Sequence, residues 1–281
     1  MNSIEIKNLT KTFSDFKLNN ISLNLPNGAI MGLVGENGAG KSTTIKLIMN
    51  SIKADSGTVT VLGKSNLSPE FVEVKQDIGI VLDEAYFPEV LNAKHIGKVM
   101  ETTYKNWDEN IYNSYLQKFS LPLHKKFKEY SRGMKMKLAI SVALSHSPKL
   151  LILDEATSGL DPMARDEILN VFNDFTRDEN NSILISSHII SDLEKICDYI
   201  TFIHNGEFVL SEEKDVLLEE YGVLKLSKQE FADLPENSIV RSQKKHFGYE
   251  VLAYKAKVNS NFRFEYTTLE DIVLFMAKEG K

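Results

Sequence analysis

The pattern of apolar and polar positions predicts two kinds of strand along this chain. Residues 4–7 and 21–25 alternate between apolar and polar side chains, as expected for antiparallel strands with one buried face. Short uninterrupted apolar runs, typical of strands buried on both faces, follow at residues 29–34, 78–82, 150–153, 183–186 and 199–203. Because helical patterns separate several of these runs, we predict an α/β core with a mostly parallel sheet, preceded by antiparallel strands.

The middle of the chain has a different periodicity. From about residue 86 to 145, apolar residues recur at helical spacing, and Pro88 and Pro122 interrupt the pattern. The strand and helix alternation resumes after this segment. We therefore predict a helical subdomain that is inserted into the core domain.

The character of the sequence changes again near residue 222. Alternating segments return and lead to an apolar helical stripe near the end of the chain, where Thr267 and Glu270 would form a capping box. The predicted organisation is a core domain over residues 1–221 and a small α+β extension over residues 222–281. The sequence of this extension does not indicate what it does.

Composition and charge are those of an ordinary soluble protein. Of the 281 residues, 42% are hydrophobic and 26% are charged, and the net charge of −6 argues against a general nucleic-acid binder. The single cysteine, Cys197, cannot form an internal disulfide, and its apolar helical context indicates a packed thiol in a reducing compartment. No apolar stretch approaches the ~18 residues that span a bilayer, so we expect a cytoplasmic chain.

The clearest motif lies between a buried strand and a predicted helix. Residues 35–43 read GENGAGKST and match the phosphate-binding loop G-x-x-x-x-G-K-[ST] at every fixed position. The glycines let consecutive backbone N–H groups face the phosphates, the lysine supplies a cation, and the next hydroxyl can bind Mg²⁺. The predicted nucleotide-binding residues are Gly35, Glu36, Asn37, Gly38, Ala39, Gly40, Lys41, Ser42 and Thr43, with Ser42 as a magnesium ligand.

A second motif joins two acids to a buried strand. The apolar run LLIL ends abruptly at Asp154 and Glu155. In phosphate-loop enzymes the first such acid holds magnesium, usually through water, and the second can take a proton from an attacking water. Asp154 is therefore the predicted magnesium residue and Glu155 the predicted base, a role that contributes on the order of 10²–10⁴ in rate.

A third segment, YSRGM at residues 130–134, opens a helical run. Alone it could be an ordinary helix start, whose free N–H groups could face an anion. Its position changes the interpretation, because the ordered set of motifs resembles the ATP-binding subunit of ABC transporters over about residues 2–215. In that family the matching motifs are the Walker A loop (35–43), the signature motif (130–134), the Walker B strand (150–155), the D-loop (158–161) and the switch histidine (188).

The resemblance implies a head-to-tail dimer with two ATP molecules between its subunits. Each site would take the Walker A loop from one subunit and Ser131 and Gly133 of the signature motif from the other, while Asp161 would support the opposing site. His188 would contact the γ-phosphate or the attacking water, and Phe13 would stack on adenine. The implied activity is Mg²⁺-dependent ATP hydrolysis coupled to transport, with ATP closing the dimer and hydrolysis relaxing it.

Two motifs depart from the usual family pattern. Where the Q-loop glutamine should follow the strand IGIVL, this chain has Asp83 and then Glu84, and an acid there can still reach magnesium or water. The signature motif has Arg132 where a second glycine is common and Met134 where glutamine is common. Because the serine and the other glycine of the motif are kept, we expect an active site. Asp83 joins the predicted metal-site residues.

The same departures favour one subgroup of the family. The signature motif, the acidic Q-loop residue and the C-terminal extension are similar to multidrug, antibiotic and peptide exporters in which ATPase and permease are separate chains. The leading hypothesis is an ATPase held on the inner face of the cell membrane by integral membrane permease subunits. The alternatives are a soluble ABC ATPase, for example in iron–sulfur cluster assembly, and a nucleotide-sensing module that no longer hydrolyses ATP. The transported substance, and whether the partner ATPase is identical, stay open.

Overall fold

A large twisted sheet runs through the main body of the molecule. The computed structural model describes residues 1–277, so residues 278–281 of the predicted extension lie outside the description. Within that range the large sheet has ten strands and a smaller sheet has three. In their spatial order, the strands of the large sheet are β5 (Lys64–Ser65), β4 (Ser56–Val61), β1 (Asn2–Thr12), β2 (Lys17–Pro26), β10 (Glu207–Glu213), β9 (Tyr199–His204), β3 (Ile30–Val34), β8 (Ser182–Ser187), β7 (Leu150–Asp154) and β6 (Ile78–Val81).

Strand direction divides this sheet into two parts, as the sequence pattern predicted. β1 pairs antiparallel with β2 and β4. β6, β7, β8, β3 and β9 follow one another as parallel neighbours. The carboxyl ends of these parallel strands therefore meet at one edge, where α/β proteins commonly bind ligands.

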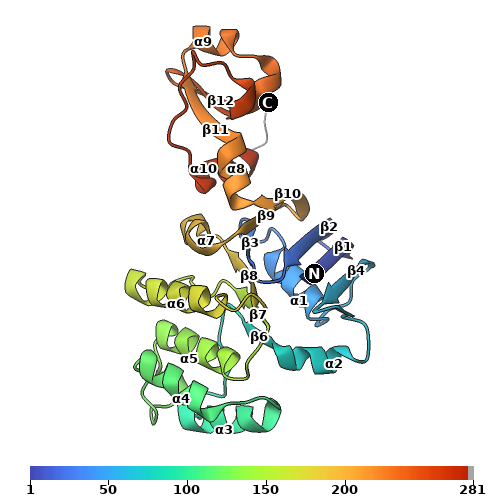
Figure 1. Cartoon of the computed structure of the whole chain (residues 1–281), viewed down its shortest axis with the longest axis vertical. Coiled ribbons are helices and arrows are strands. Elements are labelled where there is room, and N and C mark those ends of the chain that lie inside the picture. Colours follow the sequence, from blue (N-terminus) through green and yellow to red (C-terminus); the bar gives the residue numbers. More distant parts are fainter. Residues whose placement is uncertain (278–281) are drawn as a thin grey trace.

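Ten helices accompany the strands over residues 1–277 (Figure 1). They are α1 (Lys41–Ile48), α2 (Phe71–Val74), α3 (Ala93–Thr103), α4 (Glu109–Lys118), α5 (Arg132–Leu144), α6 (Pro162–Phe175), α7 (Ile190–Ile196), α8 (Lys214–Glu220), α9 (Lys228–Asp233) and α10 (Leu269–Ala277). α3, α4 and α5 fall between β6 and β7 in the chain and lie together at one end of the molecule (Figure 1). Among the helices of the described residues, no apolar segment is long enough to cross a bilayer.

The parallel strands read as unbroken apolar runs because both of their faces are covered. In β7, Leu151 and Leu153 belong to a core cluster shared with α5 and α6, whereas Leu150 and Ile152 belong to a cluster shared with α1. Successive side chains of a strand point to opposite faces, so a sheet with helices on both sides needs apolar residues at every position.

The smaller sheet is part of the C-terminal extension and lies at the end of the molecule opposite α3 and α4 (Figure 1). Its strands, in spatial order, are β11 (Tyr221–Leu226), β13 (Gly248–Tyr254) and β12 (Ile239–Lys245). The last helix, α10, packs against α7 and α8. Its buried Leu269 and Ile272 belong to the same core cluster as Leu193 and Ile196 of α7. The extension therefore shares part of its core with the main body.

The predicted cap of this last helix is wrong by one residue. Thr268 and Asp271 form the capping box, because the Asp271 N–H donates to Thr268 Oγ1 and the Thr268 N–H donates to Asp271 Oδ2. The hydroxyl of Thr267 is already used, since it accepts from the Val223 N–H and donates to the Glu265 carbonyl. Thr267 thus ties the helix entry to β11, and Glu270 has no part in the cap.

Candidate functional site

The phosphate-binding loop connects the carboxyl end of β3 to the first residue of α1. Gly40 ends the loop at a φ of +116°, which side-chain-bearing residues rarely adopt, and a Cβ there would lie 2.7 Å from Leu18. Lys41, only 5% exposed, is the first residue of the helix. Its Nζ donates to the backbone carbonyls of Gly35 and Glu36 at 2.7 and 3.2 Å. The loop thus curls around the ammonium group of its own lysine.

A cavity of about 420 Å³ opens over this loop. It brings together residues that are far apart in the sequence, including the predicted acids of two other strands. The lining residues are Phe16, Glu36, Asn37, Gly38, Gly40, Lys41, Ser42, Thr43, Asp83 and Glu155. Asp83 and Glu155 follow the carboxyl ends of β6 and β7. Because these strands are parallel neighbours, their carboxyl ends bring the two acids to the same edge of the sheet.

The carboxylate of Glu155 lies between two other predicted site residues. Its Oε1 is 3.2 Å from Lys41 Nζ, and its Oε2 is 2.7 Å from Nδ1 of His188. A carboxylate can only accept, so Nδ1 of His188 carries the hydrogen and the other ring nitrogen is left for a further partner. The side chain of Glu155 is 14% exposed, and that of His188 is 43% exposed. The pair therefore faces an accessible space rather than the core.

Ser186 is a residue of this site that the sequence analysis missed. Its hydroxyl donates to Asp154 Oδ1 at 2.5 Å and accepts from the Glu155 N–H at 3.1 Å. The Glu155 N–H also donates to the Ser186 carbonyl, and Glu155 has a left-handed φ of +51°. Ser186 on β8 thus fixes both acids of the neighbouring β7. The signal in the sequence was a pair of serines at the end of the apolar run ILISS.

The signature and D-loop residues do not line this cavity. Ser131 is the N-cap of α5, as the sequence suggested, and its hydroxyl accepts from the Met134 N–H at 3.3 Å. Asp161 is the N-cap of α6 and accepts from the N–H groups of Met163 and Ala164. The Ala164 hydrogen bond is the main reason why the pKa of Asp161 lies below its usual value. Within one chain, both residues therefore act as helix caps.

The aromatic residue at the cavity is Phe16. Phe13, which the resemblance places on adenine, is 43% exposed and is not among the lining residues, and the two ring centroids are 6.3 Å apart. Lys11 Nζ lies 5.8 Å from the centroid of the Phe13 ring. The segment TKTFSDF offers two phenylalanines to a base, and the sequence alone did not single out the second.

The carboxylates at this site suit Mg²⁺ better than a metal ion that takes all its ligands from the protein. Among the described residues, no group of three or more His, Cys, Asp or Glu side chains is arranged to hold a metal ion. Mg²⁺ usually takes one or two carboxylates, several waters and phosphate oxygens rather than a complete protein cage. Asp154, already hydrogen-bonded to Ser186, and the hydroxyl of Ser42 supply that kind of partial set.

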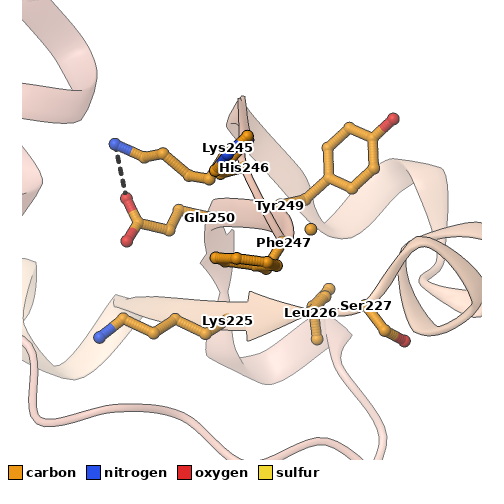
Figure 2. Close-up of a pocket in the computed structure, with 9 residues that line it drawn as sticks. Lys225, Leu226, Ser227, Lys245, His246, Phe247, Tyr249 and Glu250 are labelled. Atoms are coloured by element: carbon orange, nitrogen blue, oxygen red, sulfur yellow. Dashed lines mark ion pairs between the residues drawn. The ribbon is translucent and has the colours of Figure 1, made fainter.

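A second hollow, of about 550 Å³, lies in the C-terminal extension (Figure 2). It is formed by the end of β11 and the turn between β12 and β13, and Phe247 at that turn is 94% exposed. Figure 2 shows Lys245 paired with Glu250, at 3.0 Å, on one side of the hollow. None of the predicted nucleotide-site residues lies here.

Comparison with known proteins covers most of the chain. The family model described as "ABC transporter" matches residues 18–158, and a model described as "AAA domain, putative AbiEii toxin, Type IV TA system" matches residues 126–191. The lantibiotic transport ATP-binding protein SrtF of Streptococcus pyogenes is 36% identical over 75% of this chain and 91% of its own length. The bacitracin transport ATP-binding protein BcrA of Bacillus licheniformis is 34% identical over 88% of this chain and 81% of its own length.

A solved structure gives the same result for the fold. The structure described as an ATP binding subunit of an ABC transporter superposes with a TM-score of 0.69 at 27% identity, covering 76% of this chain and 91% of that one. Residues 1–221 are less than four fifths of the present chain, so the BcrA alignment also includes part of the C-terminal extension. With its phosphate loop, acid pair and sheet in these positions, the chain belongs to the ABC transporter family as an ATP-binding subunit.

Proposed function

We propose that this chain hydrolyses Mg²⁺-ATP to power an exporter whose permease is a separate chain. The observation that carries the proposal is the presence of Lys41 and Glu155 at one cavity, with His188 hydrogen-bonded to Glu155, since these residues supply a phosphate-binding cation, a base and an orienting partner. SrtF, a lantibiotic transport protein, and BcrA, a bacitracin transport protein, suggest that the exported substance is an antibiotic or a peptide.

In this proposal the phosphate-binding loop binds the phosphates of ATP. Backbone N–H groups of the loop and the ammonium group of Lys41 bind the β- and γ-phosphates, helped by the positive end of α1. Ser42, Asp154 and Asp83 are the residues that would hold Mg²⁺, which neutralises phosphate charge when it is bound. Phosphate oxygens would replace the Glu155 carboxylate as the partner of Lys41, because they carry more charge.

The proton step falls to Glu155. Its carboxylate accepts the proton of an attacking water, while the hydrogen bond from His188 Nδ1 fixes the direction of the carboxylate. The second ring nitrogen of His188 is then available to the water or the γ-phosphate. Ser186 keeps the backbone of Glu155 in its left-handed conformation, so the position of the base does not depend on the contacts of its side chain alone.

The family supplies the setting of this chemistry. ATP-binding subunits of ABC transporters dimerise and pair with permeases. We propose that Ser131 and Gly133 of one subunit complete the ATP site of the other, and that Asp161 supports the same site. The permease would hold the dimer at the inner face of the membrane, with residues 1–221 as the ATPase domain and residues 222–281 as an appended unit.

The substitution Glu155→Gln tests the proposed function. It should lower the steady-state rate of phosphate release by on the order of 10²–10⁴, because the amide cannot accept the proton. ATP binding should be retained, and Mg²⁺-ATP should hold the variant as a dimer in size-exclusion chromatography. Glu70→Gln is the matched control, since Glu70 forms its ion pair with exposed Lys64, away from the cavity lining. An unchanged rate in the Glu155 variant, or a monomer at saturating Mg²⁺-ATP, would contradict the proposal.

A further inference from the structure

The side chain of Arg132 lies against a glycine of the D-loop in the same chain. A Cβ atom placed on Gly159 would be 3.0 Å from Cζ and Nη1 of Arg132 and 3.1 Å from its Nε. Gly159 also has a φ of +68°, in the left-handed region that favours glycine. A glycine is therefore what lets the guanidinium group lie this close to the D-loop backbone.

The next residue of each motif also lies close to the other motif. A Cβ placed on Gly133 would lie 3.7 Å from Cδ2 of Leu160, and Leu160 is only 6% exposed. Consecutive residues of the signature motif, Arg132 and Gly133, thus lie beside consecutive residues of the D-loop, Gly159 and Leu160. The start of α5 and the D-loop are therefore neighbours in the fold.

The D-loop (158–161) and the three residues before it form one short segment that is held at both ends. One end of the segment is Glu155, whose backbone is tied to Ser186 and whose carboxylate meets Lys41. The other end is Asp161, the N-cap of α6. Between them, Ala156 and Thr157 are completely buried. A displacement at the middle of this short loop therefore has few ways to relax except through the backbone of the base.

Arg132 lines a second, smaller cavity together with two acidic residues. This cavity, of about 250 Å³, is lined by Asp83, Glu84, Arg132 and Lys135, with Ala85 and Met136. Asp83 also lines the nucleotide cavity. In the part of the chain that the structure describes, Arg132 makes no close ion pair. Its guanidinium group lies against Gly159 of the D-loop, and the two acidic residues line the same cavity. The acidic Q-loop residue and the arginine of the signature motif thus lie around one cavity.

We propose that Arg132 is a positioning residue that couples the two ATP sites of the dimer. It ties the signature motif, which serves the mate's ATP, to the D-loop, which starts three residues after this chain's own base. Engagement of the signature motif by the mate's phosphates shifts Arg132, and the contact with Gly159 carries the shift to Glu155. The inference rests on the proposed dimeric ATPase. A glycine at position 132, common in the family, has no side chain for this contact.

Mixed dimers of two differently tagged subunits test the direction of the coupling. One subunit carries Glu155→Gln, so that only the other subunit has an active base, and Arg132→Gly is placed on either one. On the subunit with intact Glu155, Arg132→Gly should lower kcat about tenfold and bring the Hill coefficient for ATP to about 1. On the Glu155→Gln subunit, whose signature motif faces the active site, the fall should stay below about twofold.

The opposite asymmetry would mean that Arg132 acts on the mate's ATP, and it would overturn the proposal. Equal effects in the two placements, or none, would overturn it as well. Gly159→Ala on the active subunit is a second variant, because it displaces the guanidinium group while the arginine is kept, and it should reproduce the loss of kcat. Lys135→Ala is the control, since Lys135 lines the same cavity, whereas the atoms nearest to a Cβ on Gly159 all belong to Arg132.

Two further readouts separate this inference from simpler explanations. ATP affinity of the monomeric subunit and its thermal midpoint should stay at parent values in Arg132→Gly, because the contact matters only when both sites engage. A loss of either would indicate local unfolding and would count against a coupling role. If the parent subunits neither dimerise nor hydrolyse ATP, the proposed function fails. A hydrolysing dimer that is insensitive to Arg132 overturns this inference alone.

Discussion

The nucleotide cavity and the hollow in the C-terminal extension contain similar residues in very different settings. Each has a lysine and a phenylalanine, Lys41 and Phe16 in the first and Lys225 and Phe247 in the second (Figure 2). Lys41 is 5% exposed and is held by two backbone carbonyls and a carboxylate, whereas Lys225 is exposed and Phe247 is 94% exposed. The comparison teaches that the proposed phosphate site differs from the C-terminal hollow in the fixed, desolvated arrangement of its residues, because residue types alone do not distinguish the two.

In each region a glycine with a positive φ permits a close approach of the backbone, but the two regions present different groups. Gly40, at a φ of +116°, lets the phosphate-binding loop turn into the first residue of α1. Gly248, at a φ of +150°, lets the β12–β13 turn approach β11 so closely that a Cβ would lie 2.1 Å from the Leu226 carbonyl oxygen. The first arrangement holds the ammonium group of Lys41 against two backbone carbonyls. The second holds an aromatic ring, that of Phe247, in solvent.

Between these two regions, the largest expected difference comes from removing a lysine from each. Lys41→Ala should lower ATPase activity by about 10²–10³, because a preorganised cation at the phosphates is lost. Lys225→Ala is the matched substitution in the C-terminal hollow and should leave the rate unchanged. Phosphate release at saturating Mg²⁺-ATP measures both. Similar losses in the two variants would break the comparison, since the C-terminal hollow would then belong to the catalytic machinery.

A core substitution in α10 asks whether the two regions fold together. Ile272 is fully buried in the cluster that α10 shares with α7, so Ile272→Ala should lower the free energy of unfolding by about 2–5 kcal/mol. Trp107, the only tryptophan of the chain, lies in the helical segment far from α10. If the two regions fold together, its fluorescence should show an unfolding transition at a lower urea concentration in Ile272→Ala than in the parent.

The control for that experiment lies on the same helix. Leu274 is 45% exposed, and Leu274→Ala should change the free energy of unfolding by no more than about 0.5 kcal/mol. If Trp107 kept its parent transition in Ile272→Ala while far-ultraviolet circular dichroism showed an earlier one, the extension would be an independent unit.

The smallest expected effect separates the two phenylalanines near the nucleotide cavity. Loss of an aromatic stacking partner costs about 0.5–1.5 kcal/mol, so Phe16→Ala should weaken ATP binding by about two- to tenfold. Phe13→Ala should have the larger effect if the family's adenine contact lies at Phe13. Fluorescence titration with a labelled ATP analogue decides between them, and parent affinity in both variants would show that neither ring holds the base.

Much of the fold was predictable because its signals are local. The apolar runs marked the buried strands, and the phosphate loop carried its conformational requirements in its own glycines. Ser131 was predicted as a helix start and is the N-cap of α5. The gathering of Asp83 and Glu155 at the loop followed from parallel strands that end at one edge.

The missed features all depend on a distant neighbour. Ser186 matters because β8 lies beside β7, which places its hydroxyl between two acids. Thr267 and Thr268 are both followed by an acid three residues later, and only the contact of Thr267 with Val223 of β11 decides which threonine caps the helix. Residue spacing along the chain contains no information on either contact.

The buried cysteine has a practical consequence. Cys197 is 1% exposed beneath the main sheet, and burial raises the pKa of its thiol above the ordinary value. Thiol reagents react with the thiolate, so the folded chain is nearly inert to maleimide dyes. A cysteine introduced on the surface would therefore carry a fluorophore selectively in the natural background, which makes distance measurements between two subunits possible without first removing a core residue.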